Sequence, residues 1–194
     1  FKTAVRNICR HRIHSILNIT GLTVGMACTM VILFWVRYEL SYDQHHKNAE
    51  RICRLATDFH FGSLQGRYAV SNHPAGPTLQ RDYPEVEKAV RFHQVWGNST
   101  VRYRDRQFVQ RGIFYGDNTV FDVFTLPLLR GDPRSALAAA YTAVITKEMA
   151  AKYFGEEDPL GKVIKLSNAV HANLHNEPDF RVTGVVEKLP PNSH

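Results

Sequence analysis

Histidine is the residue type in this chain that could most directly bind a metal, and two histidine pairs have a suggestive spacing. His45 and His46 are adjacent, so on a helix their side chains would point apart and form a poor shared site. His171 and His175 would share a helical face, but Pro178 and the neighbouring asparagines predict a loop instead. Neither pair is accompanied by a matching cluster of acids or cysteines, so we expect no metal site.

Catalytic and nucleotide-binding motifs are missing from the sequence. It contains no glycine-rich phosphate loop, no G-x-S-x-G and no H-E-x-x-H. The candidate acids stand where turns and helix caps commonly use acids; they are Asp117, Asp122, Asp132 and Glu156 to Asp158. We therefore expect a protein that is not an enzyme and holds no cofactor, which argues against a membrane-anchored enzyme.

The element that must position everything else is an uncharged stretch from Ile13 to Val36. We predict a transmembrane helix over residues 15–38, because at about 1.5 Å per residue its apolar part reaches roughly 33 Å, and a hydrocarbon core measures about 30 Å. A buried core helix would be shorter and would show one polar face. A signal peptide would need small residues after the apolar run, whereas this run closes with Phe34 to Val36 and then Arg37.

Basic residues are distributed unevenly around this stretch. Residues 1–12 contain four bases and no acid, whereas residues 37–58 contain four bases and four acids. Because basic flanks stay in the cytoplasm, we predict a cytoplasmic N-terminus and an outer domain over residues 39–194. Trp35 and Tyr38 suit the outer membrane interface, where amphipathic rings settle.

The first fourteen residues form a basic, amphipathic segment. An apolar face can lie along the inner leaflet while cations approach anionic head groups, so membrane lipid is an expected partner. The alternative is an ordinary basic flank without helical order. The bases that we assign to the inner interface are Arg6, Arg10 and Arg12.

The charge of the chain follows from this topology. Its formal charge of +6 becomes +2 once the four bases of residues 1–12 are set aside, so the pI of about 9.3 reports mainly the N-terminal flank. Arg102, Arg104 and Arg106 recur at strand spacing, and we interpret them as the solvated face of a hairpin that turns near Asp105. We expect no nucleic-acid partner.

Small residues form a stripe on one face of the predicted membrane helix. Gly21 and Gly25 are four residues apart, and Thr29 follows after four more. Such a stripe lets another membrane helix approach closely, which predicts a helix-packing role for the two glycines. The alternative is that glycine is simply common in membrane helices.

The outer residues predict a mixed α+β domain. A strand within 50–61, a helix between Pro74 and Pro84 and a strand within 85–96 would give a β-α-β unit. Thr146 can cap a helix that Gly155 ends. The remaining predicted elements are a hairpin over 99–116, a short helix near 118–124, a strand at 162–166, a loop or hairpin tip near 167–179 and a strand at 180–189 that Gly184 breaks. Since no initiator Met is present and the chain stops just after a strand, we expect a fragment that is incomplete at its C-terminus.

Several ordered blocks resemble the permease subunits of MacB/FtsX-class ABC transporters, nearly end to end. The stretch "RNICRHRIHSILNITGLTVGMAC" is similar to their first span, and "YELSYDQHHKNAERICRL" to its exit from the membrane. Downstream, "FDVFTLPLLRGDPRSAL", "ITKEMAAKYFGEEDPLGKVIKL" and "FRVTGVVEKLPPNSH" are similar to the family's later blocks. The chain departs from the pattern at "AAAYTAVIT" and at Cys53, which affects packing rather than the resemblance.

The resemblance implies a periplasmic core domain with a porter-like β-α-β lobe and a second mixed lobe. It also implies a permease of the bacterial inner membrane that pairs with a cytoplasmic ATPase and with a second permease copy or homologue. A periplasmic adaptor or a cell-wall hydrolase would be a further partner. The resulting function would be export, lipoprotein release or control of cell-wall enzymes. The rival interpretation is the extracytoplasmic sensor domain of a single-span signalling receptor.

Overall fold

The computed structural model describes residues 12–168 and 177–193. The chain divides into two compact units, one formed by Phe1–Gln44 with Pro191–His194 and the other by His45–Pro190. The predicted loop residues 169–176, with His171 and His175, lie outside the described residues, as do Arg6 and Arg10.

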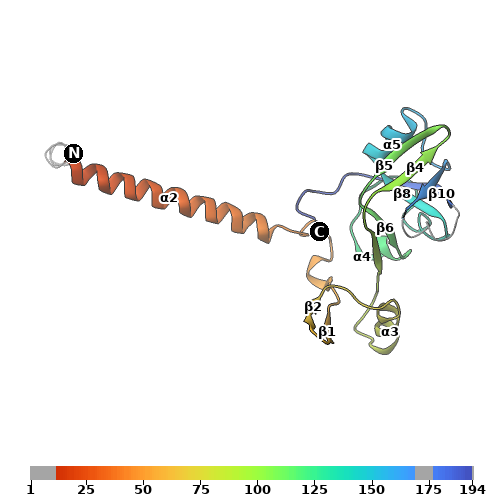
Figure 1. Cartoon of the computed structure of the whole chain (residues 1–194), viewed down its shortest axis with the longest axis horizontal. Helices are drawn as coiled ribbons and strands as arrows, with labels where there is room; N and C mark the ends of the chain where they lie inside the picture. Colours follow the sequence, from red (N-terminus) through yellow and green to blue (C-terminus); the bar gives the residue numbers. More distant parts are fainter. Residues whose placement is uncertain (1–11, 169–176, 194) are drawn as a thin grey trace. The chain divides into compact units, whose positions relative to one another are not determined.

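The first unit is dominated by α2 (Arg12–Leu40), a 29-residue helix drawn in red to orange in Figure 1. It contains no proline that would interrupt its backbone hydrogen bonds, and its two interior glycines do not break it, although glycine is a weaker helix former than alanine. The helix covers the whole of the predicted span 15–38. By length and composition it is the one helix among the described residues that could cross a membrane, with a mean hydropathy of 2.0.

The second unit is a mixed α+β domain, as predicted. In chain order its elements are η1 (Ala49–Arg51), β1 (Thr57–Phe61), β2 (Leu64–Tyr68), α3 (Ala75–Asp82), β3 (Phe92–Val95), β4 (Ser99–Tyr103), β5 (Arg106–Gln110), β6 (Ile113–Gly116), α4 (Val120–Val123), β7 (Leu128–Arg130), β8 (Thr142–Thr146), α5 (Lys147–Phe154), β9 (Val163–Ser167) and β10 (Asp179–Val186).

A six-stranded sheet holds the second unit together. Its order is β5-β4-β9-β10-β7, and β8 also pairs with β10. The β8–β10 pair is parallel and the other pairs are antiparallel. The hairpin predicted over 99–116 is present as β4–β5, with Arg104 at φ 52° in its turn, but its second strand ends at Gln110 and β6 pairs with β3 instead. β10 continues past Gly184 to Val186, so this glycine does not break the strand; it accompanies a register shift against β8.

The hydrophobic core lies between this sheet and α5. Tyr153 and Phe154 of α5 are buried to 1% and 4% exposure, and Val182 of β10 is fully buried. The helix forms where predicted: the Thr146 side chain accepts a hydrogen bond from the Met149 amide, which caps the start. Gly155 has φ 63°, a conformation that glycine adopts without strain, and it ends the helix.

The first strands pair differently from the predicted β-α-β unit. β1 occupies only Thr57–Phe61 of the expected 50–61, and it pairs with β2 across the turn at Gly62. The strand expected within 85–96 narrows to β3, which pairs with β6. The physical reason is local: Gly62 has φ 57°, so the chain reverses at once and β1 meets its nearest neighbour in sequence. The helix between the prolines is confirmed as α3.

Candidate functional site

The surface of α2 carries a long series of exposed large hydrophobic side chains. None of its residues is buried within the structure, and large side chains such as Ile13, Leu22 and Phe34 are 81%, 67% and 71% exposed. A helix that is hydrophobic all round cannot present a polar face to water. Its side chains therefore require an apolar surrounding, either lipid or another helix.

The two glycines of α2 are open. A Cβ built on Gly21 or on Gly25 would meet nothing within 4 Å. The hydroxyl of Thr29 donates to the Gly25 carbonyl at 2.8 Å, and that of Thr23 donates to the Ile19 carbonyl at 2.7 Å. Because both hydroxyls are satisfied inside the helix, the threonines can face an apolar medium without an unpaired polar group.

The two ends of α2 carry the residues assigned to the membrane interface. Arg12 begins the helix, and Trp35 and Tyr38 lie in its last turns with 62% and 46% exposure. Arg37 is the base in the last turn. Tyr38 contacts Tyr42 edge-on, with ring centroids 5.4 Å apart.

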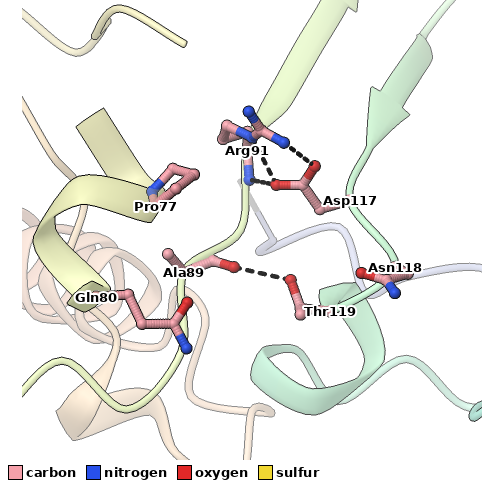
Figure 2. Close-up of a pocket in the computed structure, with 7 residues that line it drawn as sticks. All are labelled: Pro77, Gln80, Ala89, Arg91, Asp117, Asn118 and Thr119. Atoms are coloured by element: carbon pink, nitrogen blue, oxygen red, sulfur yellow. Dashed lines mark hydrogen bonds and ion pairs between the residues drawn. The ribbon is translucent and has the colours of Figure 1, made fainter. Parts of the chain in front are cut away.

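In the second unit, a polar cavity of about 180 Å³ lies between α3 and the segments that flank β3 and β6 (Figure 2). Arg91 and Asp117 line it and form an ion pair. The guanidinium of Arg91 donates to both carboxylate oxygens of Asp117, from Nη2 at 2.7 Å and from Nε at 2.8 Å. The Arg91 amide adds a third bond at 3.0 Å, and Nη1 donates to the His73 carbonyl.

This pair shifts the titration of both partners. The hydrogen bonds from Arg91 hold the pKa of Asp117 below its usual value, against the opposing effect of burial. The same bonds raise the pKa of Arg91. The carboxylate is therefore the stable form of Asp117 at neutral pH.

Two other polar side chains of the cavity, those of Thr119 and Gln80, donate to backbone carbonyls. Thr119 donates to the Ala89 carbonyl at 2.8 Å, and Gln80 donates to the Glu87 carbonyl at 3.0 Å. These hydrogen bonds hold the segment 87–91 between α3 and the start of α4. Sequence reasoning had assigned Asp117 to a turn and had not selected Arg91, because nothing local pairs two residues that are 26 positions apart.

The adjacent histidines do not lie on a helix, so their side chains are not forced apart. His46 and His45 lie in turns, and their ring centroids are 4.0 Å apart, so the rings do not point away from each other. His46 is buried, and its Nδ1 accepts a hydrogen bond from the Thr125 amide at 3.1 Å. The Lys47 amide donates to the Thr125 hydroxyl at 2.9 Å. His46 thus fastens the chain to the loop after α4.

The hairpin turns where predicted, but its arginines do not share one face: Arg102 stands opposite Gln107 and Arg106 opposite Tyr103, so these two arginines lie on opposite faces of the strand pair. Arg104 reaches Glu157 at 3.1 Å, and Arg102 reaches Glu177 at 2.9 Å. Lys162 joins the same Glu157 carboxylate at 2.6 Å. These ion pairs give Arg102, Arg104 and Lys162 acidic partners within the domain.

The chain belongs to the family of MacB-like periplasmic core domains, whose family model matches residues 15–194. This family forms the periplasmic part of ABC-transporter permeases. The described fold agrees with that assignment: an N-terminal apolar helix followed by a mixed α+β domain. Comparison with curated proteins found no matching sequence.

Solved structures that are similar to the chain include the following three. A domain assigned to a permease protein from Porphyromonas gingivalis is 24% identical with a TM-score of 0.52, over 66% of this chain and 51% of that one. The periplasmic region of MacB from Actinobacillus actinomycetemcomitans is 21% identical with a TM-score of 0.39, over 52% and 44%. The extracellular domain of the noncanonic ABC-type transporter YknZ from Gram-positive bacteria is 24% identical with a TM-score of 0.37, over 51% and 49%. The chain therefore spans about half the length of the solved structures that it matches.

Proposed function

We propose that this chain is the first membrane helix and part of the periplasmic core domain of a MacB/FtsX-class permease. Residues 1–14 would lie at the cytoplasmic interface, 15–38 would cross the inner membrane and 39–194 would be periplasmic. The observation that carries the proposal is α2 itself, a 29-residue helix with an exposed apolar surface that leads into a domain of this family. The excess of bases before the helix supports its orientation.

The permease would couple a separate cytoplasmic ATPase to the periplasmic domain. The sequence has no phosphate-binding loop, so ATP hydrolysis would belong to another subunit. Movement of α2, driven by nucleotide-dependent closure of that subunit, would reach the core domain as a rigid-body displacement. The output would be export, lipoprotein release or control of a cell-wall enzyme, with a periplasmic adaptor or a cell-wall hydrolase as a further partner.

Helix packing would join this permease copy to a second copy or to another span. The open surface at Gly21 and Gly25 supports close approach of a neighbouring helix. Arg12, Trp35 and Tyr38 would set the depth of α2 in the bilayer, together with Arg6 and Arg10.

Purification of the full-length protein tests the proposal. It should hydrolyse no ATP alone and should co-purify with an ATPase whose activity disappears when that subunit's phosphate-binding lysine is replaced. Robust hydrolysis by the isolated, uncontaminated polypeptide would contradict the proposal. A sensor would instead be indicated if the gene continued into a coiled coil and a kinase domain rather than into further membrane spans.

A further inference from the structure

The C-terminal end of α2 is held by hydrogen bonds from Ser41 and Tyr42. A helix end leaves its last carbonyls without partners inside the helix. Here the Ser41 amide and hydroxyl both donate to the Tyr38 carbonyl, at 3.1 Å and 2.6 Å. The Tyr42 amide donates to the Glu39 carbonyl at 3.3 Å. Ser41 therefore closes the helix locally, and its own carbonyl is turned toward the chain that follows.

A residue 151 positions away completes this arrangement. The side-chain amide of Asn192 donates to the Ser41 carbonyl and to the Ser41 hydroxyl oxygen, both at 2.9 Å. In return, the Asp43 amide donates to the Asn192 carbonyl at 3.0 Å. An asparagine amide has two N–H donors, and both have a partner on Ser41. Three hydrogen bonds thus join the end of α2 to the returning chain, partly shielded from water.

These three hydrogen bonds, called the clamp below, lie next to both points at which the chain passes between the two units, so they can limit rotation of the second unit. The second unit, His45–Pro190, is connected to the first by two chain junctions, one after Gln44 and one before Pro191. A domain held by a single junction can turn about the backbone dihedrals of that junction. A domain whose two junctions are tied together loses much of that freedom, because turning it would break the tie.

We propose that Asn192 is a positioning residue that clamps the returning chain to the end of α2, so that a displacement of the helix reaches both junctions of the core domain together. The inference rests on the proposed function, since it assumes that α2 transmits movement. The chemistry favours asparagine at this place: alanine removes both donors, and aspartate replaces them with a charge that would face the Ser41 carbonyl.

A fluorescent reporter on the core domain can test the clamp without knowledge of the cargo. A clickable noncanonical amino acid at Ser63, in the exposed turn between β1 and β2, would carry the dye in the full-length permease reconstituted with its ATPase. The wild type should show a nucleotide-dependent fluorescence change. Asn192→Ala should reduce that change about fivefold or more, the lower end for coupling between two sites, while ATP hydrolysis continues.

Two further variants separate the clamp from general damage to the fold. Ser193→Ala lies on the same segment and takes no part in the three bonds, so it should behave as the wild type. Ser41→Cys with Asn192→Cys should cross-link readily, because the parent side chains approach within 2.9 Å. The cross-linked protein should keep the nucleotide-dependent change, and reduction of the same sample should abolish it.

The outcomes distinguish the clamp from the proposed function. A full response in Asn192→Ala, or an equal response in the oxidised and reduced cysteine pair, would overturn the clamp while the permease assignment stands. A cysteine pair that does not cross-link in a responsive protein would overturn it as well. If the wild type shows no nucleotide-dependent change with an active ATPase present, the proposed function fails, and the coupling role of Asn192 fails with it.

Discussion

At the scale of single residues, the second unit depends on polar pairs that connect distant parts of the chain. Arg91 and Asp117 share three hydrogen bonds, and His46 and Thr125 connect segments 79 positions apart. Tyr153 belongs to the core, with its hydroxyl donating to Gln110 at 3.1 Å. Each of these groups leads to a measurable dependence of stability on mutation or pH.

Asp117→Asn should lower the free energy of unfolding by about 1–2 kcal/mol at neutral pH, because it removes a charge-assisted, partly exposed pair. The pKa of Asp117 is lower in the folded protein than the ordinary 3.8, so the stabilisation is present above about pH 4. It is lost as pH falls through the folded pKa. Denaturation at pH 7 and pH 3 should show the difference between wild type and variant shrinking in acid.

Asp122→Asn is the matched control for this experiment. Asp122 pairs with Lys88 at 3.2 Å, but both side chains are at least half exposed, so its loss should cost less than about 1 kcal/mol. Equal costs for the two variants at neutral pH would contradict a special role for the Arg91–Asp117 pair.

Tyr153→Phe should change how the free energy of unfolding depends on pH in alkaline solution. Burial raises the pKa of Tyr153 to about 12, above its ordinary value of 10. The unfolded chain therefore loses this proton first, and wild-type stability falls as pH rises from 10 toward 12. Tyr153→Phe should lack this decrease in the free energy of unfolding. The control Tyr141→Phe, at a residue that is 62% exposed, should still show the decrease. Parallel pH curves for wild type and Tyr153→Phe would refute the assignment.

At the scale of elements, α2 differs from the other helices. α5 is eight residues long and holds its place through buried aromatic rings and a Thr146 cap. α2 buries none of its residues, and a polar hydrogen-bond network caps its C-terminal end. The partner surface of α2 must therefore be lipid or another helix, which makes substitutions on its faces informative.

Leucine at Gly21 or Gly25 should weaken helix packing and partly uncouple the ATPase from the periplasmic domain. Helix contacts of this kind contribute about 1 kcal/mol each, so the double variant should lose more than either single one. Leucine at Thr23 or Met30 should have almost no effect if those positions face lipid, because lipid tails and leucine are equally apolar. ATPase stimulation in reconstituted complexes at equal expression is the measurement. Wild-type stimulation by the double glycine variant would show that coupling takes another route.

At the scale of the whole molecule, we propose a membrane topology in which the basic N-terminus is cytoplasmic and the core domain is periplasmic. The structure describes each of the two units and joins them through two chain junctions. The orientation of the membrane helix can be determined independently of any assay for transport.

A membrane-impermeant thiol reagent should label Cys53 in intact spheroplasts, because Cys53 is an exposed free cysteine in the core domain. Cys9 should react only after permeabilisation, since it precedes α2 on the predicted cytoplasmic side. Peptide mapping by mass spectrometry separates the two sites, and Cys53→Ser should remove the outside signal. Labelling of Cys9 in intact spheroplasts would invert the topology.

Elements whose causes are local could be predicted from sequence. The uncharged run from Ile13 to Val36 predicts α2 because length and hydrophobicity act residue by residue. Thr146 and Gly155 predict the ends of α5 because capping involves only neighbouring backbone groups. The β4–β5 hairpin follows from alternation around Asp105 for the same reason.

Tertiary structure alone decided which distant segments meet. The strand pattern within 85–96 does not reveal that β3 pairs with β6, because any extended segment offers the same backbone groups to a partner. Arg91 with Asp117, and Ser41 with Asn192, are 26 and 151 positions apart, and no local signal connects them. Such contacts depend on the complete path of the chain, since loop closure and core packing select one pairing among many that the residue types allow.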